Sequence, residues 1–303
     1  MRLGFVLPHI GASASPDALA RVATRAEEIG FDSVWVTERS ILPLRPQTPY
    51  PLGDLPGVYK HVLDPCGSLA FVAAQTSRVR LGTSALNLPW YSPVLLARQL
   101  TTLDVLSNGR LAVGLGQGWS KDEYDAAGVP WEHRGPRFEE ALRALKTIWT
   151  AEPVEFGGDF YTIPASSIGL KPVQQPHPPI YMAALTQTTM ARAARLADGW
   201  HPTAIPLANI PGMFEAIKSM AQDEGRDAAA LELIVRSNVA LSDRPLEDDR
   251  FDFTGSAEQL AADIAATRDI GASELIMDVT LDPSVNSVDD FVGRMELLFR
   301  LAA

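Results

Sequence analysis

Three glycines at the end of one apolar segment are the most chemically suggestive feature of the chain. Gly114, Gly116 and Gly118 occur in the segment RLAVGLGQGWSKDEY, residues 110–124. A dinucleotide-binding turn requires Gly-x-Gly-x-x-Gly at the start of a helix, and Trp119 stands where the third glycine would be. No amphipathic helix follows, because the next residues include a glycine, two prolines and no sustained apolar stripe. The glycines therefore do not predict a dinucleotide-binding turn.

The cysteine and the histidines do not form a metal-binding pattern. Cys66 is the single cysteine, so the chain can form neither an internal disulfide nor a thiolate cluster. Its setting after Asp64 and Pro65 predicts a packed residue near a helix start. The histidines are scattered without HxH or HxxxH spacing, at His9, His61, His133, His177 and His201. We predict no metal site.

Composition and charge exclude several classes of protein. The 303 residues are 46% hydrophobic and carry a formal net charge of −11. This size and apolar content are sufficient for a substantial core, whereas the negative charge disfavours binding to nucleic acid or anionic lipid. No apolar run approaches a membrane span, and the first residues, MRLGFVLPHI, lack the pattern of a signal peptide. We expect a cytoplasmic protein.

Short β-branched runs alternate with helical stripes along the whole chain. Eight strands are expected, at Arg2 to Pro8, Ser33 to Glu38, Val79 to Leu86, Arg110 to Leu115, Pro179 to Ala183, Asp198 to His201, Glu232 to Ala240 and Ser273 to Thr280. Helices are expected between and after them, at Pro16 to Ile29, Pro65 to Thr76, Pro93 to Leu106, Arg137 to Trp149, Thr188 to Ala197, Asn209 to Asp223, Ser256 to Ile270 and Val288 to Leu301.

This alternation predicts an α/β fold, a single (β/α)8 TIM barrel over residues 1–303. The segments RAEEIGFDSVWVTE and ATRDIGASELIMDV both read as a helix, an Ile-Gly stop and a buried strand, and no linker separates two domains. Ser256 with Gln259 predicts a capping box, and Gly30 and Gly271 stand where helices should stop. A doubly wound open sheet is the weaker alternative.

An excursion is expected between strands 4 and 5, from about Trp119 to Pro178. It contains one good helix and the segment PVEFGGDFYTIP, which predicts a hairpin with Gly157 and Gly158 at its turn. Excursions at the carboxyl end of a barrel commonly cover its mouth. In this arrangement Gly114, Gly116 and Gly118 mark the end of the fourth strand, where missing Cβ atoms let the backbone approach a flat ligand.

Six segments in chain order resemble the luciferase-like monooxygenase superfamily, and more narrowly its deazaflavin branch, the F420-dependent oxidoreductases. They are VWVTE, TSRVRLGTSALNLPWYSPVLLARQLTTLDVLSNGRLAVGLGQGW, HRGPRFEEALRALKTIW, FGGDFY, PPIYMAAL and ARLADGWHP. The resemblance runs from the first strand to about Pro202 and agrees with the barrel derived above. It implies coenzyme F420, or alternatively FMN, bound at the mouth, with hydride transfer as the chemistry.

The resemblance also implies which residues contact the cofactor. The family places a bulged strand end, often with a non-proline cis peptide, where this chain has Ser84 and Ala85. Small residues and a helix N-terminus for the cofactor phosphate align with Ala183 and the residues that follow, although the usual glycine pair is absent. The predicted cofactor-binding residues are Thr83, Ser84, Ala85, Asn87, Gly116, Gln117, Gly118, Ala183, Ala184, Thr186 and Thr188.

Four residues are the candidates for catalysis. Glu38 ends the second strand, and Arg39 follows it where the family usually has a histidine. Arg39 stays protonated, so it can stabilise an anion but cannot act as an acid or base. A proton donor must come from elsewhere, and His9 and Glu123 are the candidates.

Aromatic residues and a long loop are expected to shape the substrate pocket. Trp90, Tyr91 and Trp119 follow strand ends, and the proline-rich segment ILPLRPQTPYPLGDLPGVYKHV is expected to act as a lid. A further family motif is expected only to anchor the excursion's helix, through Arg134, Arg137, Glu139 and Glu140.

Three functions follow in order of preference. The first is an oxidoreductase that transfers hydride between F420 and a small organic substrate. The second is an FMN-dependent two-component monooxygenase, which would require a reductase partner. The third is a barrel that binds a flavin without turnover, which the loss of the histidine at Arg39 keeps open. A hydrolytic barrel finds no support, because the chain lacks a metal cluster and a convincing carboxylate pair. We expect a homodimer, as in related barrels.

Overall fold

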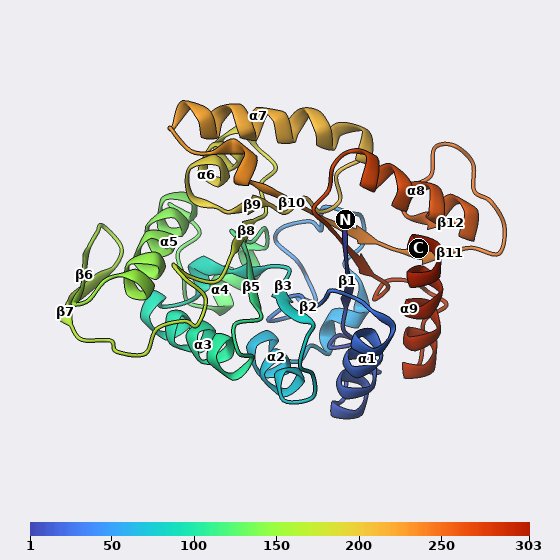
Figure 1. Cartoon of the computed structure of the whole chain (residues 1–303), viewed down its shortest axis with the longest axis horizontal. Helices are drawn as coiled ribbons and strands as arrows, with labels where there is room; N and C mark the ends of the chain where they lie inside the picture. Colours follow the sequence, from blue (N-terminus) through green and yellow to red (C-terminus); the bar gives the residue numbers. More distant parts are fainter.

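Parallel strands close into a barrel in the computed structural model, which describes all residues from 1 to 303 (Figure 1). The ring closes because β1 pairs with β13 and β3 pairs with β5. A short additional strand, β4 (Leu86–Asn87), pairs with the end of β5. The ring contains β1 (Arg2–Val6), β2 (Ser33–Val36), β3 (Arg80–Thr83), β5 (Leu111–Gly116), β8 (Ile180–Met182), β9 (Gly199–Trp200), β10 (Glu232–Asn238) and β13 (Glu274–Asp278). The predicted TIM barrel is confirmed.

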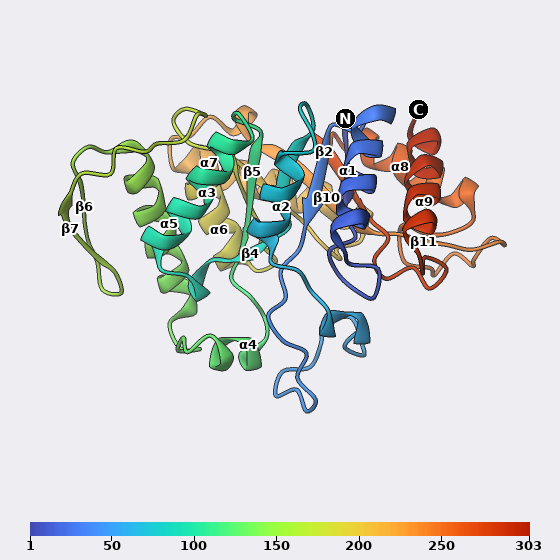
Figure 2. The same cartoon turned by 90° about the horizontal axis from the view of Figure 1, so that it is seen from below.

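Helices surround this ring, mostly within a few residues of the predicted bounds (Figures 1 and 2). The Ser256 capping box forms as predicted, and Gly30 ends its helix at a φ of 107°, which glycine adopts without strain. The helices are α1 (Pro16–Ile29), α2 (Pro65–Ala73), α3 (Pro93–Leu106), α4 (Lys121–Ala126), α5 (Arg134–Thr150), α6 (Gln187–Leu196), α7 (Ile210–Asp223), α8 (Ala257–Asp269) and α9 (Val288–Ala302). None of them combines the length and apolarity that crossing a lipid bilayer requires.

The excursion between β5 and β8 lies beside the barrel more than over it. Its hairpin, β6 (Val154–Gly157) and β7 (Thr162–Ser166), runs along the outer side of α5 in both views of the molecule (Figures 1 and 2). Glu140 on α5 accepts hydrogen bonds from the backbone of Asp159, Phe160 and Tyr161 at 2.7–2.9 Å. The expectation that the excursion covers the mouth therefore holds only for α4, and the anchoring role expected of Glu140 is observed.

Trp35 is the largest side chain in the middle of the barrel interior, where it packs with Tyr181 and smaller apolar residues. Because side chains alternate across a strand, Trp35 points inward while Val34 and Val36 face the surrounding helices. A Cβ atom at Gly82 would lie 2.1 Å from the Trp35 ring, and one at Gly4 would lie 2.7 Å from its Nε1. The two glycines are therefore required for the tryptophan to fit.

Below Trp35, the same alternation closes the amino-terminal end of the barrel with charged side chains. Glu274 has a fully buried side chain and accepts hydrogen bonds from Arg2 Nε and Trp35 Nε1, each at 3.0 Å. Arg80 reaches the same carboxylate at 3.4 Å, and Arg2 also pairs with Glu232 at 2.5 Å. A buried carboxylate is tolerated only when cations and donors surround it, as they do here.

Replacing Glu274 with glutamine should lower the free energy of unfolding by about 3 kcal/mol, because it leaves the partly buried guanidinium groups of Arg2 and Arg80 without the buried carboxylate that they share. Urea unfolding monitored by circular dichroism measures this change. The control is Glu28→Gln, because Glu28 pairs with Arg25 on the exposed surface of α1 and should cost less than about 0.5 kcal/mol. Equal losses for the two variants would contradict this account.

Candidate functional site

A cavity of about 600 Å³ opens at the carboxyl ends of the barrel strands. The predicted lid loop borders it through Tyr50, Pro51, Leu52 and Tyr59, and is attached to α4 by the Thr48 hydroxyl, which accepts from Lys121 N at 3.1 Å. Figure 2 shows this loop and α4 extending beyond the same end of the barrel. The predicted site residues that line the cavity are Glu38, Arg39, Ser84, Ala85, Asn87, Gly116, Gln117, Gly118, Trp119, Glu123, Ala183 and Thr186.

The predicted bulge forms one wall of the cavity. The Ser84–Ala85 peptide is cis, as expected from the resemblance, and it lies between the end of β3 and the start of β4. Thr83 does not line the cavity. The Thr83 hydroxyl instead donates to the carbonyl oxygen of Gly114 and accepts from its backbone N–H, each at 2.9 Å. These two hydrogen bonds connect β3 to β5 behind the bulge.

His201 fixes the direction of the Ser84 hydroxyl. His201 Nδ1 lies 2.8 Å from the carbonyl oxygen of Ile234, so this nitrogen carries the proton and donates it. His201 Nε2 must then accept from the Ser84 hydroxyl, which lies 2.8 Å away. Burial lowers the pKa of His201 to about 4, so the ring is neutral at physiological pH. The oxygen of Ser84 is left with lone pairs available to a bound ligand.

The three glycines of the fourth barrel strand have different roles. A Cβ atom at Gly114 would lie 2.0 Å from the carbonyl oxygen of Thr83, so this glycine allows the close approach of two strands and not of a ligand. Gly118 has a φ of 77°, which favours glycine. Gly116 lines the cavity, and a Cβ atom there would lie 3.6 Å from the Ala85 Cβ, an ordinary van der Waals contact. The interpretation of all three as ligand-facing is therefore wrong for Gly114.

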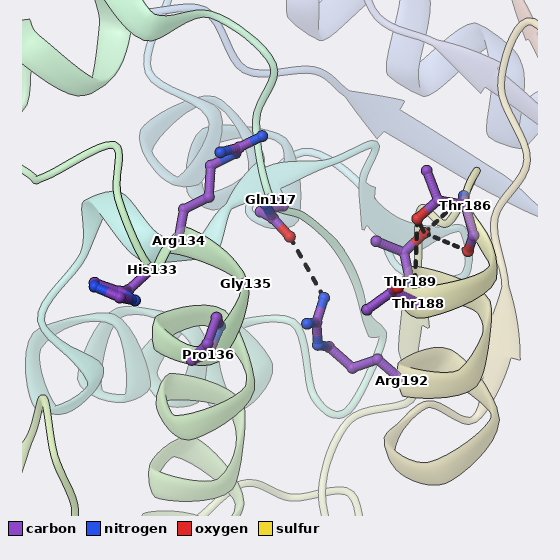
Figure 3. Close-up of a pocket in the computed structure, with 9 residues that line it drawn as sticks. All are labelled: Gln117, His133, Arg134, Gly135, Pro136, Thr186, Thr188, Thr189 and Arg192. Carbon is purple, nitrogen blue, oxygen red and sulfur yellow. Dashed lines mark hydrogen bonds between the residues drawn. The ribbon is translucent and has the colours of Figure 1, made fainter.

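A second pocket of about 340 Å³ adjoins the first where the N-termini of α5 and α6 meet (Figure 3). Thr186 caps α6 in a reciprocal capping box with Thr189, and Arg192 extends from α6 toward Gln117, whose Oε1 lies 3.4 Å from Arg192 Nη1. No carboxylate lines this pocket. Its lining residues are Gln117, His133, Arg134, Gly135, Pro136, Thr186, Thr188, Thr189 and Arg192.

This second pocket has the properties of a phosphate site. Backbone N–H groups at helix N-termini attract anions, and two such termini converge here. The Nε atom of Arg134 is buried without a hydrogen-bond partner, and Arg134 lines both pockets. An unpaired buried donor is costly unless a ligand satisfies it. The donor set therefore fits a cofactor phosphate, and Thr186 and Thr188, both predicted to bind the cofactor, line this pocket.

Glu38 is held as a partly buried carboxyl group at the wall of the main cavity. It accepts hydrogen bonds from Asn87 N at 2.5 Å, from Asn87 Nδ2 at 3.1 Å and from the Tyr91 hydroxyl. Burial raises the pKa of Glu38 to about 7, and the nearby Glu123 carboxylate acts in the same direction. Glu38 can therefore hold a proton at neutral pH beside the place where a ligand binds.

Arg39 pairs with Glu123, not with Glu38. Their side chains are 11% and 2% exposed, and Glu123 also accepts from Ser40 N at 2.9 Å. The guanidinium lies 4.5 Å from the centre of the Trp119 ring and 5.2 Å from that of Tyr59. Glu123 is thus committed to neutralising Arg39, and the sequence-based idea that Glu123 transfers protons finds no support in its contacts.

Several predicted residues lie behind the cavity wall and do not line it. His9 is fully buried: its Nδ1 donates to Leu7 O at 2.8 Å, and its Nε2 accepts from Thr37 N at 2.8 Å. With both nitrogens engaged by backbone and its pKa lowered by burial, His9 is poorly placed as a proton donor. Trp90 packs edge-on against Tyr124, Tyr91 contacts Glu38, and Ala184 O accepts from Trp200 Nε1.

Other cavity residues were missed by sequence reasoning. Arg134 was assigned only an anchoring role, and His201, Arg236 and Asn238 were assigned none. Period-two alternation could have found two of them, because inward-facing Ile234 on β10 is followed two and four residues later by Arg236 and Asn238. Arg236 pairs with Asp278, which follows inward-facing Ile276 on β13 in the same way.

The model of one protein family, described as luciferase-like monooxygenase, matches residues 1–250. The chain belongs to this family. Membership confirms the resemblance stated from the sequence and the prediction of an enzyme, and it speaks against a barrel without turnover. The coarse chemistry is that of an oxidoreductase or monooxygenase.

The relatives of this luciferase-like enzyme include enzymes that use two kinds of cofactor. An uncharacterized Mycobacterium tuberculosis protein is 39% identical over 208 residues, 67% of this chain and 72% of the relative. An F420-dependent glucose-6-phosphate dehydrogenase of Amycolatopsis mediterranei is 34% identical over 61% of this chain and 53% of its own length. An FMNH2-dependent dimethylsulfone monooxygenase of Pseudomonas putida is 37% identical over 50% of this chain and 42% of its own length.

Solved structures show the same fold. The monooxygenase RslO1 from Streptomyces bottropensis superposes with a TM-score of 0.79 at 23% identity, covering 99% of this chain and 98% of that one. The coenzyme F420-dependent tetrahydromethanopterin reductase from Methanopyrus kandleri gives 0.78 at 16% identity, covering 99% and 97%. At these identities the likeness concerns the barrel alone.

Replacing Arg134 with methionine should raise the dissociation constants of both FMN and F420 at least tenfold, because each loses a charge-assisted hydrogen bond to its phosphate. Fluorescence titration measures both constants. The matched control is Arg300→Met, because Arg300 is an exposed residue in the last turn of α9 that lines neither pocket and should leave binding unchanged. Unchanged binding by the Arg134 variant would show that the phosphate lies elsewhere.

Proposed function

We propose that this chain transfers a hydride between coenzyme F420 and a small organic substrate. The observation that carries the proposal is one continuous site: the anion pocket shares Gln117, Arg134, Thr186 and Thr189 with the cavity that holds Glu38 and the Ser84–Ala85 bulge. One cofactor can therefore place its phosphate in the anion pocket and its ring against the bulge in the main cavity. When bound, the deazaflavin supplies or accepts the hydride.

The charge of the anion pocket supports F420 over FMN. His133, Arg134 and Arg192 line it without any carboxylate. Glu139, the carboxylate closest to Arg192, is shared with Arg195 and Arg143, so positive charge is in excess around the pocket. F420 carries a phosphodiester followed by several carboxylates, whereas FMN ends in one phosphate. A longer anionic tail makes better use of this excess.

The protein's own contribution to the chemistry is a proton. In the direction of substrate reduction, a negative charge develops on the substrate and must be neutralised. Glu38 lines the cavity, holds a proton at neutral pH and is kept in place by Asn87 and Tyr91. These properties are those of a general acid, and they supply the donor that Arg39 cannot be.

The alternative is an FMN-dependent monooxygenase served by a separate reductase. The FMNH2-dependent monooxygenase of Pseudomonas putida among the relatives favours it. A titration of the purified protein with F420 and FMN, oxidised and reduced, tests the choice. Tighter saturable binding of F420 supports the proposal, and tighter binding of FMN would replace it with the monooxygenase.

Activity in the reducing direction should fall as the pH rises through about 7, because Glu38, with its pKa near 7, then loses the proton it must donate. Replacing Glu38 with glutamine should lower kcat by about 10²- to 10⁴-fold and remove this fall. A pH profile of kcat in stopped-flow turnover measures both effects.

The Tyr91→Phe variant is the control for this assignment. The Tyr91 hydroxyl donates to Glu38 and favours its ionised form. Its removal should raise the pKa of Glu38 further and move the fall in activity to higher pH. A profile that stays in place would show that another group titrates.

A further inference from the structure

The arginines in the main cavity that the anion pocket does not share are both neutralised. Arg39 is paired with Glu123, and Arg236 is paired with Asp278. All four side chains are at least 88% buried, since their exposures are 11%, 2%, 12% and 4%. Each pair brings one positive and one negative charge, so neither adds net positive charge to the cavity. Arg236 Nε is still a buried donor without a hydrogen-bond partner, which a neutral acceptor such as a carbonyl oxygen can satisfy. Glu38 is the remaining acidic group that lines the cavity, and its ionisation gives this region a net negative charge.

The same region has aromatic and aliphatic walls. Tyr50 lies 5.5 Å from Trp119 and 6.3 Å from Tyr59, measured between ring centres, and both of these rings contact the Arg39 guanidinium. Pro51 and Leu52 of the lid loop and Leu185 after β8 complete the apolar lining. Such walls favour planar or apolar ligands, because burying apolar surface is favourable and aromatic faces stack on one another.

We propose that the substrate is an uncharged organic molecule with an aromatic or apolar body, bound between the lid aromatics and the cofactor ring. An anionic substrate, such as the glucose 6-phosphate of one dehydrogenase among the relatives, would meet two neutralised arginines and the carboxyl group of Glu38. It would lose its hydration without gaining an ionic partner. This inference rests on the proposed function, since it names the substrate class of the same site.

Acetophenone and benzoate test the inference, because they have nearly the same shape and differ in charge. Titration calorimetry on the cofactor-loaded protein should give at least tenfold tighter binding of acetophenone. Equal affinities, tighter binding of benzoate or no binding of either probe would overturn the proposal. This comparison uses the unaltered protein, so it does not depend on the folding of a variant.

The Glu123→Gln variant tests the reason for the preference. Without the Glu123 carboxylate, Arg39 is an unpaired cation, so benzoate should bind at least tenfold more tightly than to the unaltered protein, with acetophenone changed less than threefold. The matched control is Asp125→Asn, which removes a carboxylate of the same helix that pairs with Lys121 at the surface. It should leave both affinities unchanged. If the affinity for benzoate rose equally in both variants, the change in the net charge of the protein would explain the effect, and the proposed role of Arg39 would be wrong.

Failure of the proposed function is distinguishable from failure of this inference. If neither F420 nor FMN binds, the cofactor assignment fails. The two probes then titrate the free protein, whose Arg39, Glu123 and Trp119 are present without any cofactor. A preference for acetophenone there supports the uncharged substrate class, and its absence overturns it.

Discussion

Closure of the parallel sheet is the constraint on which every other feature of this protein depends. The pairings β1–β13 and β3–β5 leave no free edge, and they bring all carboxyl ends of the strands to one rim. Residues as far apart in the chain as Glu38, Ser84, Gln117, His201 and Arg236 therefore line one cavity. A ring this small has little interior space. The side chains that point inward at each level of the barrel therefore decide whether that level is a packed core, a set of ion pairs or a ligand-binding site.

Period-two alternation divides the interior into three levels with different chemistry. Charged residues around Glu274 close the amino-terminal end, and Trp35 with its glycine neighbours fills the middle. The inward positions at the mouth carry small or polar side chains, such as Ser84, Gly116 and Ala183. A large side chain in the middle blocks passage through the barrel, so ligands enter and leave only at the mouth. The lower levels provide stability, and the upper level is left for binding.

Electrostatics divides the site along its length. The anion pocket holds positive charge in excess at two helix N-termini, while the arginines beyond it are matched by buried carboxylates. The raised pKa of Glu38 belongs to the same pattern, because a partly desolvated carboxyl group near another carboxylate keeps its proton. The anion pocket is thus suited to hold the charged part of a cofactor. The region around Glu38 is suited to bind an uncharged substrate and to donate a proton to it.

The sequence alone determined the elements, because hydrophobic period and helix caps are local: the eight barrel strands, the capping box at Ser256 and the hairpin after α5 were all predictable. The bulge at Ser84 was expected from the family resemblance alone. Only the tertiary structure decided which side chains meet. Glu123 was expected to transfer protons but pairs with Arg39, His9 was expected at the mouth but is satisfied by backbone, and Arg134 was expected to anchor a helix but lines the anion pocket. Pairing partners, burial and therefore pKa values depend on residues brought together from distant strands, and no local pattern encodes those distances.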